Sequence, residues 1–278
     1  MAGKEGVSWS TASKSHVKRR NDCEHNLFDA RRNNQTTVRR TKMMHDFTTH
    51  LQLRKGVQVA LVLILLSLGS AFAQERSVNP GINDRWEKPD MQEAVSMLER
   101  EYPVIYKYRH AIVAALGLEP GSAAADVGAG TGFIAQLLAR EVGPEGKVYA
   151  VEISQESLDY IMKEAEKEGH ANIAPVLGEH RTTNLSRDSA DVIVTIRTYH
   201  HFEYPVDMLE SIKAALRPEG RFVVIDRERI KGVTSEENFE HFRAGKGTIT
   251  DEILDAGFVL EKELPLIPDF YYLVFKER

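Results

Sequence analysis

The sequence predicts an α/β domain with a mostly parallel sheet, helices on both faces and a helical cap in front. From residue 122 onward, short apolar runs alternate with segments of helical periodicity, the pattern of strands joined by crossover helices. A glycine-rich turn directly follows the first apolar run, where open α/β sheets bind ligands. The last two apolar runs have no helix between them, so we expect them to pair as an antiparallel hairpin.

The predicted strands are short segments rich in Val, Ile, Leu and Ala. They stand at residues 123–127, 147–151, 173–177, 191–196 and 221–226, with the closing pair at 258–264 and 271–275.

Helices are predicted where apolar residues recur on one face. One follows the glycine turn, and the next begins near Ser154, a suitable N-cap residue with an apolar stripe behind it. Further helices are expected at 205–216 and 250–256. Two amphipathic helices, 85–100 and 106–116, precede the first strand and are expected to cap the carboxyl edge of the sheet.

Charge divides the chain into two unlike parts. Residues 1–55 contain 12 Lys and Arg against 5 Asp and Glu, whereas residues 75–278 contain 24 against 36. An acidic body disfavours nucleic acid as a partner, because binding a phosphate backbone requires a basic surface. The single cysteine, Cys23, excludes an intrachain disulfide and any metal site built from several thiolates.

The segment 57–73, VQVALVLILLSLGSAFA, has the features of a secretory signal peptide. Arg54 and Lys55 precede its apolar run, and an Ala-x-Ala site predicts cleavage after Ala73. Without cleavage it would be a membrane anchor, the only membrane contact that we expect. The protein is therefore predicted to be exported, periplasmic or membrane-anchored, if this signal is real, and cytoplasmic otherwise.

Four regions follow from this pattern. They are a basic, disordered extension (1–42), the signal peptide or anchor (43–73), a linker (74–83) and the main domain (84–278). A start of translation at Met43 or Met44 would explain the unusual length of the extension, which would then be an annotation artefact.

The glycine turn, Gly128, Gly130 and Gly132, predicts a nucleotide-like ligand close to the backbone. Phe133 stands where a dinucleotide fingerprint has its third glycine, and no Lys-Ser/Thr pair follows that would make a phosphate loop. Asp126, two residues before the first glycine, would repel a pyrophosphate but suits a ligand that carries an ammonium and a sulfonium group.

Glu152 stands at the end of the second predicted strand, 20 residues after Gly132. A carboxylate at this position accepts hydrogen bonds from ribose hydroxyls in many nucleoside sites. The acid, the glycines and the second acid together favour an adenosyl-sulfonium site over a phosphate site.

Longer motifs carry a family resemblance. AADVGAGTGFIAQLLA resembles the first motif of class I S-adenosylmethionine-dependent methyltransferases, and VYAVEIS resembles their acidic second motif. ADVIVTIRTYHHFEYPVDMLESIKAALRPEGRFVVID is similar to a block of their small-molecule "type 11" branch. The resemblance covers residues 84–278 and implies a Rossmann-like sheet of seven strands whose last strand is antiparallel.

The resemblance also implies contacts with S-adenosylmethionine. The backbone of the glycine loop approaches the methionine moiety, and Asp126 supports the loop or meets the amino group. Glu152 binds the ribose hydroxyls. Ile153 packs on the adenine, whose amino group donates to Glu179. The full set implied for the cofactor is Asp126, Gly128, Ala129, Gly130, Gly132, Glu152, Ile153 and Glu179.

Catalytic candidates follow the fourth predicted strand: Tyr199, His200 and His201. A base is needed only when the acceptor arrives protonated, and adjacent histidines point in different directions, so we expect at most one to face the methyl group. No acidic or histidine partner stands at ligand spacing from the pair, and the sequence predicts no metal site.

Two further clusters can be interpreted either as parts of a substrate site or as structural features without a function. Tyr102, Tyr106 and Tyr108 either line a lid or simply pack, and residues 241–246 form either a basic patch for an anionic substrate or a solvated loop.

The function predicted from these observations is S-adenosylmethionine-dependent methyl transfer to a small organic molecule by in-line displacement. The sequence lacks an Asn/Asp-Pro-Pro-aromatic motif, which argues against methylation of a nucleobase or glutamine. Two alternatives stay open at this point. They are an exported, non-enzymatic binding protein on a methyltransferase fold and a nicotinamide-dependent oxidoreductase.

Overall fold

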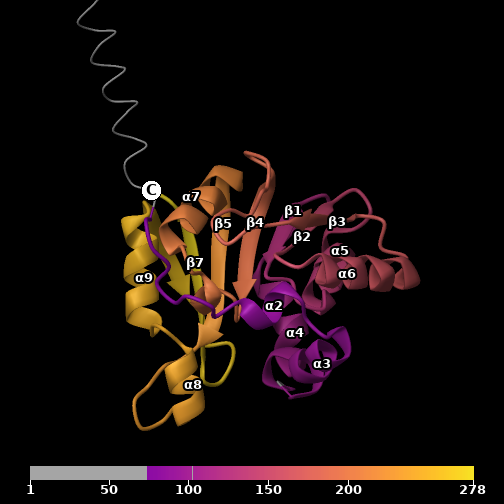
Figure 1. The fold of residues 1–278 in the computed structure, drawn as a ribbon. Helices are drawn as coiled ribbons and strands as arrows, with labels where there is room; N and C mark the ends of the chain where they lie inside the picture. Colours follow the sequence, from indigo (N-terminus) through magenta and orange to yellow (C-terminus); the bar gives the residue numbers. More distant parts are fainter. Residues whose placement is uncertain (1–73, 102) are drawn as a thin grey trace, which may run out of the picture. The chain divides into compact units, whose positions relative to one another are not determined.

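The computed structural model describes residues 74–101 and 103–278 (Figure 1). The predicted basic extension and the signal segment lie outside the described residues. Within the described part of the chain, no helix has both the length and the apolar character needed to cross a membrane.

A seven-stranded sheet in the order β3-β2-β1-β4-β5-β7-β6 forms the centre of the domain. All neighbouring strands are parallel except β7, which runs antiparallel to both β5 and β6. This arrangement confirms the predicted mostly parallel sheet and its closing hairpin. The strands are β1 (Ala123–Val127), β2 (Lys147–Glu152), β3 (Ile173–Leu177), β4 (Ala190–Ile196), β5 (Leu216–Arg227), β6 (Phe258–Glu263) and β7 (Phe270–Glu277).

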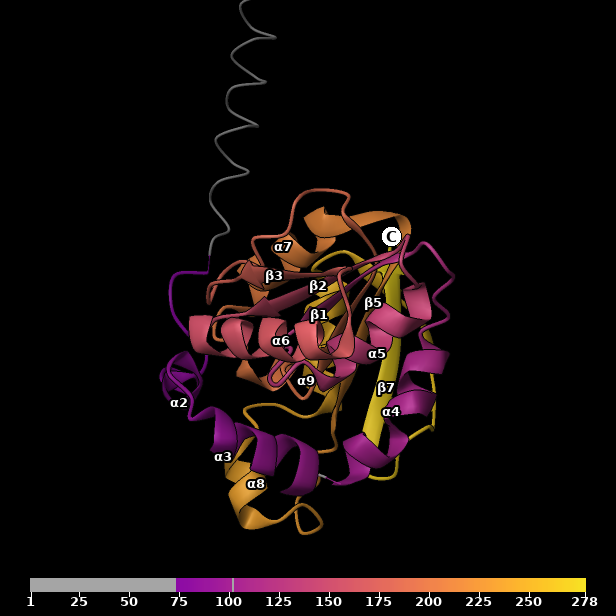
Figure 2. The same cartoon turned by 90° about the vertical axis from the view of Figure 1, so that its right-hand side faces the viewer.

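Helices cover both faces of the sheet (Figures 1 and 2). One face packs against α4 (Pro103–Ala115), α5 (Phe133–Val142) and α6 (Gln155–Glu168). The other packs against α7 (Pro205–Ala215) and α9 (Lys246–Asp255). Because β1 lies between these two layers, all five of its residues are buried, and four of them are apolar. The remaining residue of β1 is Asp126. Because its side chain is a carboxyl group, its burial needs a functional explanation.

Local sequence signals explain where the helices begin. The Ser154 hydroxyl accepts a hydrogen bond from the Ser157 amide, as expected for an N-cap, and α6 ends at Gly169 in a left-handed conformation. Such caps satisfy backbone groups that have no partner within the helix.

The prediction of a single helix over residues 85–100 is wrong. The segment is divided into α2 (Asp84–Glu87), α3 (Met91–Val95) and a π-helical turn, η1 (Ser96–Glu101). Pro89 disfavours a helical conformation in Lys88 before it, and the Asp90 side chain then caps α3 by accepting from the amides of Gln92 and Glu93.

A short helix that the sequence did not predict, α8 (Glu236–His241), follows β5. It has no buried residue and hence no apolar stripe to reveal it, although Ser235 caps it by accepting from the Asn238 amide. This helix places His241 beside the segment that follows β4.

Candidate active site

A cavity of ≈ 400 Å³ opens at the carboxyl ends of β1, β2 and β4. This is the edge at which open α/β sheets bind ligands. The structure brings six of the predicted site residues to its wall: Gly128, Gly130, Glu152, Ile153, Glu179 and His201. The rest of the wall comes from the N-terminal cap, the segment after β3, the segment after β4, and α8.

The backbone of the glycine turn packs close to neighbouring side chains because its glycines have no side chains of their own. Gly128, Gly130 and Gly132 have φ of +77°, +60° and +77°, a region that other residues adopt at a cost. A Cβ at Gly128 would lie 2.3 Å from the Thr198 side chain, and one at Gly130 would lie 2.8 Å from Leu98. The turn is thus a backbone surface that a ligand can approach closely.

We expect Gly128→Ala to destabilise the fold by about 2–4 kcal/mol and to abolish ligand binding, because it combines a left-handed φ with overpacking against Thr198. Gly169→Ala is the matched control, since Gly169 has the same φ of +77° with nothing within 4 Å of a new Cβ. Urea denaturation checks the difference. An equal loss in the two variants would show that the contact with Thr198 has no effect.

Glu152 joins the end of β2 to the glycine turn. Its Oε1 accepts from the Gly130 amide at 2.6 Å and its Oε2 from the Ile153 amide at 3.1 Å. Burial raises the pKa of this carboxyl, although the two amides oppose the shift. The carboxylate lines the cavity with lone pairs that can still accept from hydroxyl groups of a ligand.

Asp126 is the least ordinary residue of the site. Its side chain is 2% exposed, and its Oδ2 has no hydrogen-bond partner in the described part of the chain. Burial, together with the nearby Glu152, raises its pKa to about 7. It lines a smaller cavity of ≈ 50 Å³ beside the first one, which Gly128 and Ala129 also line.

A buried acceptor without a partner next to an open space fits a ligand that donates a hydrogen bond or carries a positive charge. The ammonium group of S-adenosylmethionine has both properties. The residues present therefore fit this cofactor, with Asp126 facing a cation and Glu152 facing hydroxyls. A pyrophosphate would be repelled by both carboxylates.

Glu179 and Gly132, two other predicted cofactor residues, are less directly placed to contact a ligand. Glu179 accepts from the Asn184 side chain at 3.4 Å and is exposed at the edge of the cavity. Gly132 precedes α5 and faces Ile161 of α6, so its place is structural, and it lines neither cavity.

Tyr199, predicted as a catalytic candidate, lies in the core instead. It is fully buried, and its hydroxyl donates to Glu252 of α9 at 3.1 Å. The short helix η2 (Tyr199–His201) turns successive side chains in different directions, which sends this ring away from the cavity and His201 towards it.

His200 is buried with Asp226 of β5. Its Nδ1 lies 2.7 Å from Asp226 Oδ2, and both side chains are 1% exposed. His201 lines the cavity, and burial lowers its pKa well below 6.5, with His200, His241 and Arg197 contributing in the same direction. The ring of His201 is therefore neutral at physiological pH.

The cap is built from residues that the sequence analysis did not single out. Trp86, Met97 and Leu98 line the cavity, whereas Tyr106 and Tyr108 do not, and Tyr102 lies outside the described residues. Asn83 connects the cap to the segment after β4, because its amide donates to the His201 carbonyl at 3.0 Å. Trp86, Met97 and Leu98 belong to the predicted segment 85–100, whose periodicity indicates an amphipathic helix but not contact with a ligand.

The predicted basic patch at 241–246 is not present as such. Arg243 pairs with Glu252 at 2.7 Å, and Lys246 pairs with Glu263 at 2.9 Å and Glu228 at 3.2 Å. These acids, which come from α9 and from neighbouring segments, neutralise both cations. His241 is the member of this segment that lines the cavity.

Comparisons with known proteins agree with this geometry. Residues 118–256, half of the chain, match the family model of a methyltransferase domain. An uncharacterized 37.1 kDa protein of Streptomyces fradiae is 28% identical over 59% of this chain and 51% of its own length. Protein-L-isoaspartate O-methyltransferase of Methanothrix thermoacetophila is 30% identical over 39% of this chain and 49% of its own length. The chain thus spans about half the length of these curated relatives.

Among solved structures, a SAM-dependent methyltransferase from Aquifex aeolicus has a TM-score of 0.61 at 22% identity. The match covers 68% of this chain and 98% of that one, and at this identity it shows the fold. The family match does not support the nicotinamide-dependent alternative. The chain belongs to the methyltransferase-domain family, with the Rossmann-like fold of class I S-adenosylmethionine-dependent methyltransferases, and S-adenosylmethionine is its cofactor.

Proposed function

We propose that the protein transfers the methyl group of S-adenosylmethionine to a small organic acceptor. One observation supports this most strongly. The glycine turn, the unpartnered carboxyl of Asp126 and the carboxylate of Glu152 meet around adjoining cavities at the carboxyl edge of the sheet.

The chain's own residues would hold the cofactor by charge, hydrogen bonds and packing. Asp126 Oδ2, which has no hydrogen-bond partner among the described residues, would accept from the ammonium group. Glu152 would accept from the ribose hydroxyls while keeping the amides of Gly130 and Ile153. The side chain of Ile153 provides an apolar surface for the adenine ring.

Bound S-adenosylmethionine supplies an electrophilic methyl group on a sulfonium, which is displaced in line with its bond to sulfur. The contribution of the protein is then alignment of the acceptor, which lowers the entropic part of the barrier. Trp86, Met97 and Leu98 of the cap line the cavity and would reduce the contact of a bound ligand with water.

Of the three predicted catalytic candidates, only His201 lines the cavity. His201 lines the wall, but a pKa well below 6.5 makes it a weak proton acceptor, since an efficient general base has a pKa near the working pH. An acceptor that is already a nucleophile, or one that is activated in another way, fits this site better than a phenol that needs a strong base.

The size of the site supports a small acceptor. A cavity of ≈ 400 Å³ lies in the usual range for sites that bind small molecules, roughly 300–1,000 Å³. Most of this space would hold the cofactor, so the acceptor reaches the methyl group from the side of η2 and α8.

Isothermal titration of the purified chain with S-adenosylmethionine tests the proposal. We expect Glu152→Ala to weaken binding about 100-fold, because it removes the acceptor for the ribose and loosens the glycine turn. Glu166→Gln is the control, since Glu166 is exposed on α6. Wild-type protein that does not bind the cofactor, or a Glu152→Ala variant with unchanged affinity, would contradict the assignment.

A further inference from the structure

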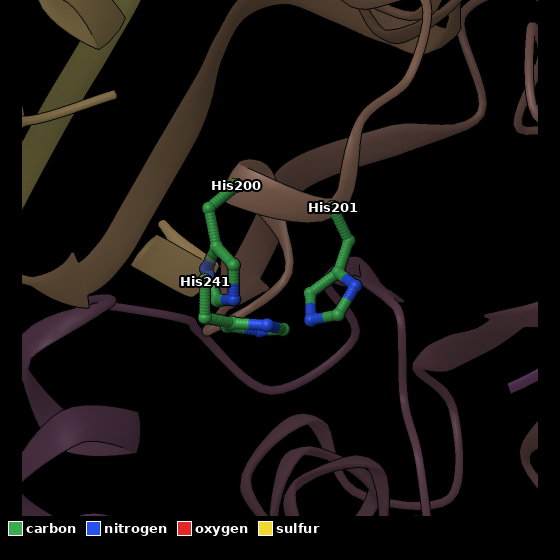
Figure 3. Close-up of side chains that lie close together, drawn as sticks. All are labelled: His200, His201 and His241. Atoms are coloured by element: carbon green, nitrogen blue, oxygen red, sulfur yellow. The ribbon is translucent and has the colours of Figure 1, made fainter. Parts of the chain in front are cut away.

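Three histidines from two distant segments meet beside the cavity (Figure 3). His200 and His201 belong to η2, and His241 is the last residue of α8. Each offers a ring nitrogen, and these nitrogens all lie within 4.8 Å of one another. Figure 3 shows the three rings converging on a common space. The sequence spacing did not reveal the third histidine, which lies 40 residues further along the chain.

His200 is fixed in the orientation of a metal ligand. Because its Nδ1 is held by Asp226 at 2.7 Å, its Nε2 is the atom that faces the cluster. That Nε2 is buried and has no hydrogen-bond partner in the residues that the structure covers. A carboxylate that holds the far nitrogen of a histidine is the usual support of a metal-bound imidazole.

Carboxylates close to the cluster favour a cation there. Asp226 holds His200 at 2.7 Å, and Glu237, which belongs to the same helix as His241, lines the cavity. Arg197 also lines the cavity and acts against a cation.

We propose that His200, His201 and His241 bind a divalent transition-metal ion of the zinc type. Three imidazoles with one position left open are the ligand set of catalytic zinc sites. Nitrogens bound to a tetrahedral zinc lie about 3.4 Å apart, so the present spacing requires a small closure of the rings. His241 can provide it, because it is exposed at the end of a six-residue helix.

The open position would face the methyl-transfer cavity, since His201 and His241 line it together with Gly128. A metal there would bind an oxygen or sulfur donor of the acceptor and make it a better nucleophile at neutral pH. This role rests on the proposed function, whereas metal binding itself does not.

An alternative is that the rings only pack. His200 and His201 have ring centroids 4.3 Å apart, and His241 lies 5.2 Å and 5.1 Å from them, distances that aromatic contacts also produce. Packing alone leaves His200 Nε2 unpartnered and predicts no specific affinity for a metal. The two possibilities therefore differ in a measurable result.

The test is a calorimetric titration of the full chain with Zn²⁺ after treatment with a chelator. We expect one tight site that weakens at least 100-fold in His241→Ala and His201→Ala. His110→Ala, in an exposed histidine of α4, is the matched control and should keep the site. The control matters because residues 1–73 contain four more histidines and Cys23, which can bind zinc nonspecifically.

Two further measurements make the result unambiguous. A Co²⁺ absorption spectrum with a tetrahedral signature, lost in His241→Ala, would support the three-histidine site. Because the zinc titration contains no S-adenosylmethionine, its outcome does not depend on cofactor binding, which separates this inference from the proposed function. Equal zinc affinity in His241→Ala and wild type, or no tight site at all, would overturn the proposal.

Discussion

Replacing Asp126 by Asn is expected to stabilise the protein at pH 8 and to reduce its affinity for S-adenosylmethionine about 100-fold. Asp126 is 2% exposed and its pKa is raised from 3.8 to about 7, first by burial and then by Glu152. At pH 8 the wild-type carboxylate is ionised in a site that penalises charge, and Asn removes this cost. The same substitution removes the charge that, in the proposed function, would pair with the ammonium group.

The sign of the pH dependence follows from the direction of the shift. The folded state binds the Asp126 proton more tightly than the unfolded state does, so this group's contribution to stability is fully present below pH 3.8. It is lost as the pH rises to about 7. A shift of this size corresponds to on the order of 4 kcal/mol at most, at about 1.4 kcal/mol per pKa unit. Asn should therefore match wild type near pH 4 and exceed it at pH 8.

Urea denaturation at pH 4.5 and pH 8 measures the stability, and calorimetry at pH 8 measures the affinity. Asp251→Asn is the control, because Asp251 is exposed on α9 and should change neither quantity by much. Wild-type affinity for the cofactor should also rise with pH up to about 7, as Asp126 ionises. If the Asn variant were no more stable than wild type at pH 8, burial of the ionised Asp126 carboxylate would have no cost in stability.

Asp226→Ala is expected to destabilise the protein by about 3–5 kcal/mol, because removing a buried carboxylate leaves its hydrogen-bond donors without partners. Asp226 accepts from His200 Nδ1 at 2.7 Å and from the Arg227 amide at 2.8 Å. Removing the carboxylate leaves both donors in a region from which water is excluded. Asp226→Asn should cost less, since one amide oxygen can still accept from His200.

The pH dependence of this pair has the opposite sign to that of Asp126. Burial alone raises the pKa of Asp226, but His200, the Arg227 amide and Arg197 outweigh it and bring the pKa below 3.8. The contribution of the pair is therefore present above pH 3.8 and is lost as the pH falls through the lowered pKa. The deficit of Asp226→Ala should shrink as the pH falls below 3.8, because the Asp226 carboxylate is then lost in the wild type as well.

Chemical denaturation in the presence of a chelator measures this effect without any contribution from bound metal. Glu168→Ala is the comparison, because Glu168 forms an ion pair with Arg140 in which both side chains are about half exposed. Pairs of this kind contribute at most about 1 kcal/mol. If Asp226→Ala cost no more than Glu168→Ala, the buried pair would have no special role in the fold.

Most of the fold could be predicted because its signals are local. A buried parallel strand needs a continuous apolar run, and β1 and β3 have the bounds that their sequences predict. The Ser154 cap likewise depends on residues within one helical turn. The amphipathic pattern of residues 84–101 did not predict the breaks in the cap helix. The pattern continues through Pro89 and Asp90, although Pro89 disfavours a helix and Asp90 caps a new one.

The cofactor half of the site was also predictable, for a topological reason. β1 and β2 are adjacent and parallel, so the residues at their carboxyl ends must come together. Gly130 and Glu152, 22 residues apart, are consequently joined by a hydrogen bond of 2.6 Å. The short spacing within one βαβ unit leaves little freedom for any other arrangement.

The acceptor half was not predictable from spacing. Tyr199 and His201 are two residues apart, yet one ring is in the core and the other lines the cavity, because η2 turns between them. His241 reaches the same cavity from a helix with no buried residue and no periodic pattern.

The sequence by itself therefore determined the sheet, the family and the cofactor, since these depend on apolar runs and on motifs within consecutive strand–helix units. Only the tertiary structure decided which residues outside the cofactor motifs line the cavity. It showed that Asp126 Oδ2 has no hydrogen-bond partner among the described residues, that Asp226 orients His200, and that His241 completes a cluster of three. These relations join segments far apart in the chain, and their geometry is set by how the segments pack on the sheet.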